Sequence, residues 1–95
     1  MLNAETTGIG VAALVRHHIT ELLGEAGITV GRLDDTDELN ALGLNSLMLA
    51  RLILQLEMET GVDPFAEELA VSDVRTVAEL TTAYENARAT ATATA

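Results

Sequence analysis

Apolar residues in the first third of the chain repeat with the period of an α-helix. They stand at positions 11, 14, 15, 19, 22 and 23, and His18 falls within the same stripe. Gly24 and Gly27 follow the stripe, and glycine readily takes the left-handed conformation found just beyond a helix C-terminus. The pattern therefore predicts a helix over residues 8–24 with one apolar face.

Residues 25–45 lack this periodicity and predict a long connection. Three separated apolar residues, at positions 28, 30 and 33, are spaced for an extended stretch that covers a core. Asp35 and Glu38 have the spacing of a capping box, with Asp in the role of Ser or Thr. We therefore expect a short helical turn over residues 38–42, ended by Gly43.

A second helix is predicted over residues 46–60, capped by Asn45 or Ser46 and ended by Gly61. Its tightest apolar stripe is formed by positions 49, 52, 53 and 56, yet apolar residues cover nearly its whole circumference. The face outside this stripe comprises Leu47, Met48, Ala50, Arg51, Leu54 and Met58. Because a small domain can hardly bury a helix on all sides, we interpret this face as a partner surface rather than as additional core.

Beyond the second helix, Asp63-Pro64 interrupts the chain, and a short helical turn is expected within 65–69 or 72–75. Thr76 and Glu79 form a full capping box before a last helix whose positions 77, 80, 84 and 87 face inward. No strand pattern is found, so the predicted fold is an all-α bundle of three longer and one or two short helices. We expect a flexible segment at 1–7, one domain over 8–88, and a disordered Ala/Thr tail at 89–95.

Composition and charge narrow the function classes. The 95 residues carry a net charge of −10, and they include no Cys and no Lys. This negative charge disfavours binding to nucleic acid and to anionic membranes, and it favours binding to basic protein partners. There is no signal-peptide pattern and no apolar run of the ~18 residues that a membrane span needs, so we expect a cytoplasmic protein. We also expect a monomer.

The candidates for catalysis and metal binding are weak. His17 and His18 are adjacent, so their side chains should point about 100° apart on a helix and should not share a metal ion. The acidic run at 34–38 lacks the spacing and the glycine of an EF-hand loop. Without Cys, Lys or a Gly-rich phosphate loop, most nucleophile and nucleotide schemes fail, and we predict neither an enzyme nor a metal site.

Ser46 is the position with the most specific chemistry. It follows Gly43-Leu44-Asn45 at the start of the second helix, where the hydroxyl should project into water. The free N–H groups and the positive end of the helix dipole lie beside such a hydroxyl and favour a phosphate. Since Ser is also a common helix-capping residue, this spacing alone does not decide the function.

Residues 39–62, with the sequence LNALGLNSLMLARLILQLEMETGV, resemble the core of phosphopantetheine-dependent carrier proteins. The preceding amphipathic helix and long loop, and the VRTVAEL segment at 74–80, extend the resemblance over residues 9–87. It implies that a phosphopantetheinyl transferase joins 4′-phosphopantetheine from coenzyme A to Ser46, flanked by Asn45 and Leu47. The terminal thiol then holds an acyl, aminoacyl or peptidyl group as a thioester.

The resemblance also implies partners. A loading enzyme, either an adenylation enzyme or an acyltransferase, would charge the carrier, and condensing, tailoring or releasing enzymes would use it. The apolar face with the single cation Arg51 is more similar to peptidyl carriers of nonribosomal peptide synthesis than to acyl carriers of fatty-acid and polyketide systems, whose faces are usually acidic. We expect a free-standing (type II) peptidyl carrier, with a polyketide or fatty-acid acyl carrier as the alternative.

Asn45 stands where the family commonly has Asp or His before the serine, which leaves the choice of transferase uncertain. A different class of function, an unmodified helical adaptor that binds through the apolar face of the second helix, explains the same exposed apolar pattern.

Overall fold

The computed structural model describes residues 10–66 and 70–94 and is all-α over these residues. The elements in order are α2 (Val11–Glu25), α3 (Leu39–Leu42), α4 (Ser46–Thr60), the 3₁₀ helix η1 (Val71–Asp73) and α5 (Val77–Thr94). Within the described ranges, the β pairing is limited to one isolated bridge between Glu38 and Thr76. The predicted class, three longer helices with short helices between them, is confirmed. The segment 1–7, predicted to be flexible, lies outside the described residues.

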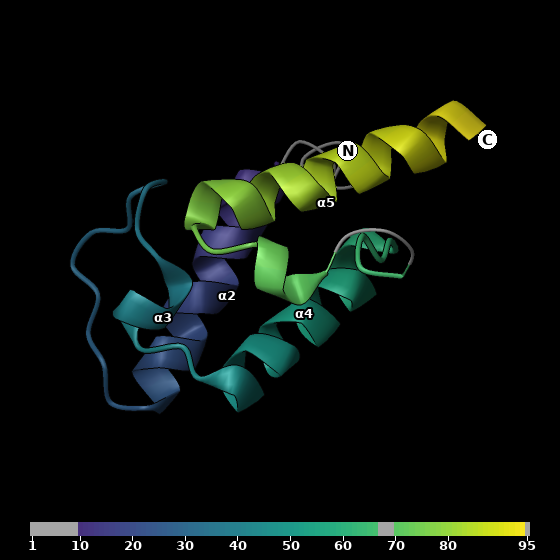
Figure 1. Cartoon of the computed structure of the whole chain (residues 1–95). Helices are drawn as coiled ribbons and strands as arrows, with labels where there is room; N and C mark the ends of the chain where they lie inside the picture. Colours follow the sequence, from purple (N-terminus) through teal and green to yellow (C-terminus); the bar gives the residue numbers. More distant parts are fainter. Residues whose placement is uncertain (1–9, 67–69, 95) are drawn as a thin grey trace, which may run out of the picture.

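Helix α2 is the centre of the bundle, because it packs against both α4 and α5 (Figure 1). Its predicted apolar stripe is buried, with only Leu14 of that stripe partly exposed, and His18 is buried with it. The helix continues through Gly24 to Glu25, and Gly27 (φ +83°) takes the left-handed conformation just beyond it. The Ile28 N–H then donates a 2.8 Å hydrogen bond to the carbonyl oxygen of Leu23, which turns the chain into the long connection.

The core is built almost entirely from aliphatic side chains. Its one fully buried aromatic residue among those described is Tyr84, and the Phe65 ring contacts it edge-on, with the ring centroids 6.1 Å apart. The buried apolar residues are Val11, Val15, Ile19, Leu22, Leu23, Leu39, Leu44, Leu52, Leu56, Val74, Val77, Leu80, Ala83 and Tyr84. Every helix described except η1 contributes to this cluster, so its burial is the main favourable contribution to folding.

The connection between α2 and α3 is held by long-range contacts. The Arg16 guanidinium donates hydrogen bonds to the Leu33 carbonyl oxygen and to the Asp35 carboxylate. Backbone carbonyls of the same connection accept hydrogen bonds from the first N–H groups of α5: Val77 to Asp37 at 3.0 Å and Ala78 to Asp35 at 2.9 Å. The connection thus satisfies donors at the start of α5 that have no partner within the helix.

The predicted capping box of Asp35 and Glu38 is wrong. Helix α3 begins after Glu38 without a side-chain cap, because the Asp35 carboxylate pairs with Arg16 instead. The local turn is closed by Asp37, whose carboxylate accepts a 2.8 Å hydrogen bond from the Asp34 N–H. The end of α3 is as predicted, with Gly43 in the left-handed region at φ +112°.

The second predicted capping box is confirmed. The Glu79 N–H donates to Thr76 Oγ1 at 3.1 Å, and Glu79 Oε1 accepts from the N–H groups of Thr76 and Arg75. Helix α5 then runs to Thr94, whereas we expected a disordered tail from residue 89. Alanine has the highest helix propensity, and extending an established helix costs far less than nucleating a new one, so the Ala/Thr segment continues the helix.

The segment between α4 and α5 contains a turn at residues 64–66 and η1 at Val71–Asp73, close to the alternative predicted at 72–75. The other predicted turn, at 65–69, lies partly outside the described residues. Among the helices described, we find none with the length and hydropathy required to traverse a bilayer.

Candidate functional site

The start of α4 exposes the Ser46 side chain to solvent. Asn45 precedes the helix in an extended conformation and caps it, since its Oδ1 accepts a 2.8 Å hydrogen bond from the Met48 N–H. The Asn45 carbonyl oxygen accepts the first backbone hydrogen bond of the helix from Leu49, also at 2.8 Å. Of the two predicted caps, Asn45 is therefore the cap, and the Ser46 hydroxyl is not used for that purpose.

The surroundings of Ser46 suit an anionic group such as a phosphodiester. The N–H groups of Ser46 and Leu47 precede Met48 in the first turn and have no intrahelical acceptor. The first turn of α4 contains no acidic residue, so the positive end of the helix dipole is not neutralised there. A phosphate bound to Ser46 Oγ thus fits this helix start, and the exposed oxygen is accessible to a modifying enzyme.

A mostly apolar groove runs along α4 from Ser46. It has a volume of about 460 Å³ and lies between α4 and η1. Its lining residues are Ser46, Leu49, Ala50, Ile53, Leu54, Glu57 and Val71. Those on α4 follow the spacing i, i+3, i+4, i+7, i+8 and i+11 from Ser46, so one helix face carries the serine and the groove.

Glu57 is the acidic group among the residues lining this groove. Desolvation raises the pKa of Glu57 above its ordinary value, and both a side-chain hydrogen bond with Asp63 and the negative charge of Asp63 act in the same direction. The groove thus combines apolar walls with one carboxyl group that is more easily protonated than usual, three helical turns from Ser46.

Most of the predicted partner face is exposed. Leu47, Leu54 and Met58 are 71%, 57% and 76% exposed, which is far above the exposure of the core leucines of the same helix. Ala50 and Arg51 are exposed as well, and Arg51 forms a 3.0 Å ion pair with Glu25 of α2. Met48 differs from the prediction, because its side chain is half-buried and packs against the core.

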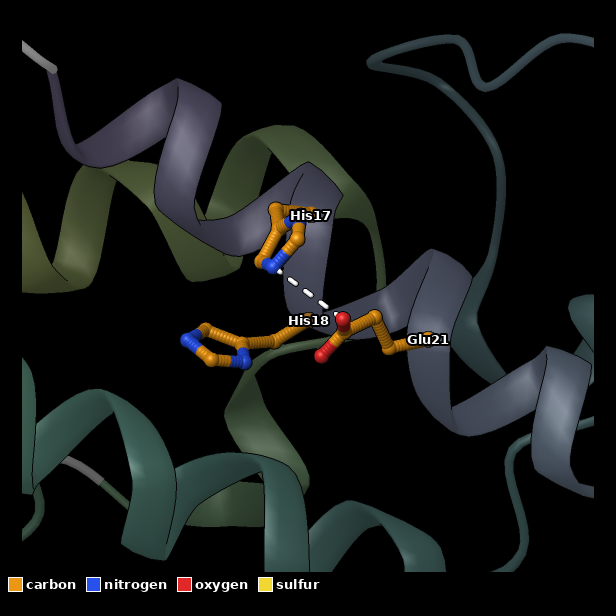
Figure 2. A group of neighbouring side chains, drawn as sticks. All are labelled: His17, His18 and Glu21. Atoms are coloured by element: carbon orange, nitrogen blue, oxygen red, sulfur yellow. Dashed lines mark ion pairs between the residues drawn. The ribbon is translucent and has the colours of Figure 1, made fainter.

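The rings of the two histidines lie closer together than their divergence on the helix suggests. His17 is exposed and His18 is buried, as expected, but their ring centroids lie only 5.2 Å apart in an edge-on arrangement. Ligand-capable atoms of His17, His18 and Glu21 all lie within 4.8 Å of one another (Figure 2). Side-chain torsions bring the adjacent rings together although their Cβ atoms diverge on the helix.

Comparisons with known proteins identify the family of the chain. Residues 13–83 match the family described as "Phosphopantetheine attachment site", and this range includes Ser46, all of α3, α4 and η1, and most of α2. The chain belongs to the phosphopantetheine-binding carrier protein family. Carrier proteins of this family are not catalysts, and the match implies a 4′-phosphopantetheine prosthetic group.

The fold of this carrier protein also occurs in a solved structure. The solution structure of MacpD, an acyl carrier protein from Pseudomonas fluorescens involved in mupirocin biosynthesis, is similar with a TM-score of 0.70 and 38% sequence identity. The alignment covers 87% of this carrier protein and 74% of MacpD. A search of curated protein sequences gave no match.

The sequence predicted the position of Ser46 at a helix start and the cap beside it, but not the groove. The residues of α4 that line it share one helical face with Ser46, so their spacing was readable from the sequence. Val71 gives no such signal, because it lies 25 residues beyond Ser46 and reaches the groove only through the position of η1.

Proposed function

We propose that Ser46 is the residue of this carrier protein that bears the 4′-phosphopantetheine arm. The chain has two serines, Ser46 and Ser72. Ser46 stands exposed at the start of the fifteen-residue helix α4, whereas Ser72 lies in the three-residue η1 beside the carboxylate-bearing Asp73. The exposed hydroxyl at the uncompensated N-terminus of α4 is the single observation that supports this choice most strongly. The thiol of the bound arm would hold the cargo as a thioester.

Intact mass measurement tests this proposal. The purified protein is incubated with coenzyme A and a broad-specificity phosphopantetheinyl transferase, and we expect one added phosphopantetheinyl group. Ser46→Ala should gain no mass, and Ser72→Ala should gain the same mass as the wild type. A Ser46→Ala protein that is still modified would contradict the proposal, as would a wild type that several transferases leave unmodified.

We further propose that the cargo is an acyl group. The 38% identity to an acyl carrier of mupirocin biosynthesis supports this proposal, and the mostly apolar groove beside Ser46 is compatible with an acyl chain. A second candidate is an aminoacyl or peptidyl cargo, which is favoured by the exposed apolar face of α4 with its single cation, Arg51. Mass spectrometry of the protein from its native producer separates the two, because it weighs the tethered group directly.

The same proposal assigns α4 to recognition by the transferase, the loading enzyme and the enzymes that use the charged carrier. The apolar side chains of Leu47, Leu54 and Met58 would supply contact area on the side of α4 that is not used for the core. The net charge of −10 would attract basic partner surfaces over longer distances. If the protein instead acts as an unmodified adaptor, Ser46→Ala should leave partner binding intact.

A further inference from the structure

A group of metal-ligating side chains lies on α2, outside the groove described above. The group consists of one ring nitrogen from each of His17 and His18 and one carboxylate oxygen of Glu21. These three atoms all lie within 4.8 Å of one another (Figure 2). His17 Nε2 and Glu21 Oε2 are 3.4 Å apart, one helical turn along the same face. Groups of this kind are common on protein surfaces without a metal ion, so their spacing alone does not indicate a ligand.

The buried histidine distinguishes this group from an ordinary surface cluster. The His18 side chain is 8% exposed, and its Nε2 forms a short hydrogen bond with the Glu59 carboxylate of α4. Its other ring nitrogen, Nδ1, is buried and finds no hydrogen-bond partner in the described part of the chain. Nδ1 is the ring nitrogen bonded to the ring carbon that is attached to Cβ. In Figure 2 this nitrogen is on the side of the ring nearer Glu21. A buried polar atom without a partner is costly and therefore calls for a ligand.

This arrangement matches the way in which proteins prepare a histidine for a metal ion. A ligating imidazole usually donates its second N–H to a carboxylate, which fixes both the tautomer and the orientation of the ring. When His18 Nε2–H donates to Glu59, Nδ1 carries the free lone pair. In Figure 2 this nitrogen lies on the Glu21 side of the ring, and a nitrogen of His17 and an oxygen of Glu21 lie within 4.8 Å of a His18 ring nitrogen.

We propose that His17, His18 and Glu21 bind a divalent first-row transition metal ion of the zinc type, with Glu59 as the positioning residue behind His18. Two imidazoles and one carboxylate suit Zn²⁺ and its neighbours better than Mg²⁺ or Ca²⁺, which prefer all-oxygen sites. Two ligand atoms on one Zn²⁺ lie at most about 4 Å apart, so small rotations of the side chains would bring the three ligand atoms to binding distance. His17 and Glu21 are free to rotate, since their side chains are 60% and 58% exposed.

The site is separate from the attachment chemistry. Glu59 lies thirteen residues beyond Ser46 on α4, which corresponds to about 20 Å along the helix. A bound ion would link α2, through the ring of His18, to the C-terminal end of α4. We therefore expect the metal to stabilise the packing of these two helices and to leave the modification of Ser46 unchanged.

Isothermal titration of zinc chloride into the untagged, chelator-treated protein near neutral pH tests the proposal. We expect one saturable site per chain and a higher melting temperature with zinc than without it. His17→Ala removes an exposed ligand without touching the core and should weaken binding at least tenfold. Glu25→Gln is the matched control, because it neutralises an exposed carboxylate one turn further along α2 and should bind zinc like the wild type.

The role of Glu59 is tested separately. Glu59→Gln retains an oxygen that can accept from His18 but loses the negative charge, and it should weaken zinc binding by about 10–100-fold. With Co²⁺ as the probe, the wild type should show visible absorption bands that His17→Ala lacks. The proposal is overturned if zinc binding is not saturable, or if His17→Ala and Glu25→Gln bind zinc equally well.

Discussion

The phenol of Tyr84 in α5 donates a 3.2 Å hydrogen bond to the carbonyl oxygen of Ile53, near the middle of α4. Tyr84 is fully buried, and Ile53 lines the groove that begins at Ser46. The bond therefore holds the helix that carries the attachment site against the last helix of the bundle. It also satisfies the polar end of the largest fully buried side chain in the core.

Removing this bond should destabilise the protein moderately. Tyr84→Phe keeps the ring and its edge-on contact with Phe65 but loses the hydroxyl, so the free energy of unfolding should fall by about 0.5–1.5 kcal/mol. Urea unfolding followed by circular dichroism measures this difference. An unchanged midpoint would mean that the hydrogen bond contributes nothing to stability.

Tyr84 should also determine the stability at alkaline pH. Burial, followed by the negative charges of Glu57 and Asp63, raises the pKa of Tyr84 well above its ordinary value of 10.0. Because the folded state holds the phenol proton more tightly, its contribution to stability is complete below pH 10 and is lost as the pH rises above that value. The chain has no Lys, no Cys and no second Tyr, so few other groups titrate in this range.

Urea unfolding at a series of pH values between neutral and strongly alkaline checks this expectation. The wild type should lose stability above pH 10, and Tyr84→Phe should show a much smaller loss over the same range. Phenolate absorbance in the folded wild type should appear only together with the loss of helical circular dichroism. Ionisation of Tyr84 in the folded protein at its ordinary pKa would contradict the expectation.

Local signals in the sequence predicted α4 and its surroundings well. Gly43, Asn45 and Gly61 act within their own turns, and both glycines take the left-handed conformation that their positions require. The Thr76–Glu79 box was predictable for the same reason, because both of its hydrogen bonds span only three residues. Elements of this kind depend on neighbouring residues alone, so the sequence contains the whole interaction.

Contacts between distant segments were not predictable in this way. Asp35 fits a capping box by spacing, yet Arg16, nineteen residues earlier, takes its carboxylate. The approach of the His17 and His18 rings depends on the position of Glu59 in another helix, which fixes the His18 ring. The half-buried position of Met48 likewise follows from how α4 is turned against the core, which helical periodicity leaves open for a helix that is apolar all round.

Gly43 should be required both for its backbone conformation and for space. Its φ of +112° is strained for any other residue, and an added Cβ would lie 2.7 Å from Ile28 Cδ1. We expect Gly43→Ala to lower the free energy of unfolding by about 1–3 kcal/mol. Gly24→Ala is the matched control, because a Cβ there meets nothing within 4 Å inside α2. It should raise stability by about 0.5–1 kcal/mol. Chemical unfolding of both variants measures the contrast, and equal effects of the two substitutions would show that neither reason applies.

The cap at Asn45 should be separable from recognition by the transferase. Asn45→Ala loses the hydrogen bond to the Met48 N–H and should destabilise the protein by about 1 kcal/mol. Asn45→Asp keeps an acceptor and adds a negative charge at the helix start, so its stability should equal or slightly exceed that of the wild type. Thermal unfolding measures the stabilities, and the rate of mass gain with each transferase measures recognition. If Asn45→Ala is as stable as the wild type, the side-chain cap is not important for α4.

The exposed face of α4 should affect partner recognition without affecting folding. Met58 is 76% exposed, so Met58→Glu should change the free energy of unfolding by no more than about 0.5 kcal/mol while slowing modification or loading by an enzyme that contacts this end of the helix. Leu54→Glu should act in the same way closer to Ser46.

Ala13→Glu places the same charge at an exposed position of α2 and should leave the rates unchanged, which separates a local contact from the effect of net charge. Leu52→Ala, in contrast, removes a fully buried side chain and should cost about 2–5 kcal/mol. Loss of helical circular dichroism in Met58→Glu would mean that the side chain belongs to the core, and equal slowing by Ala13→Glu would mean that charge alone, not this face, determines recognition.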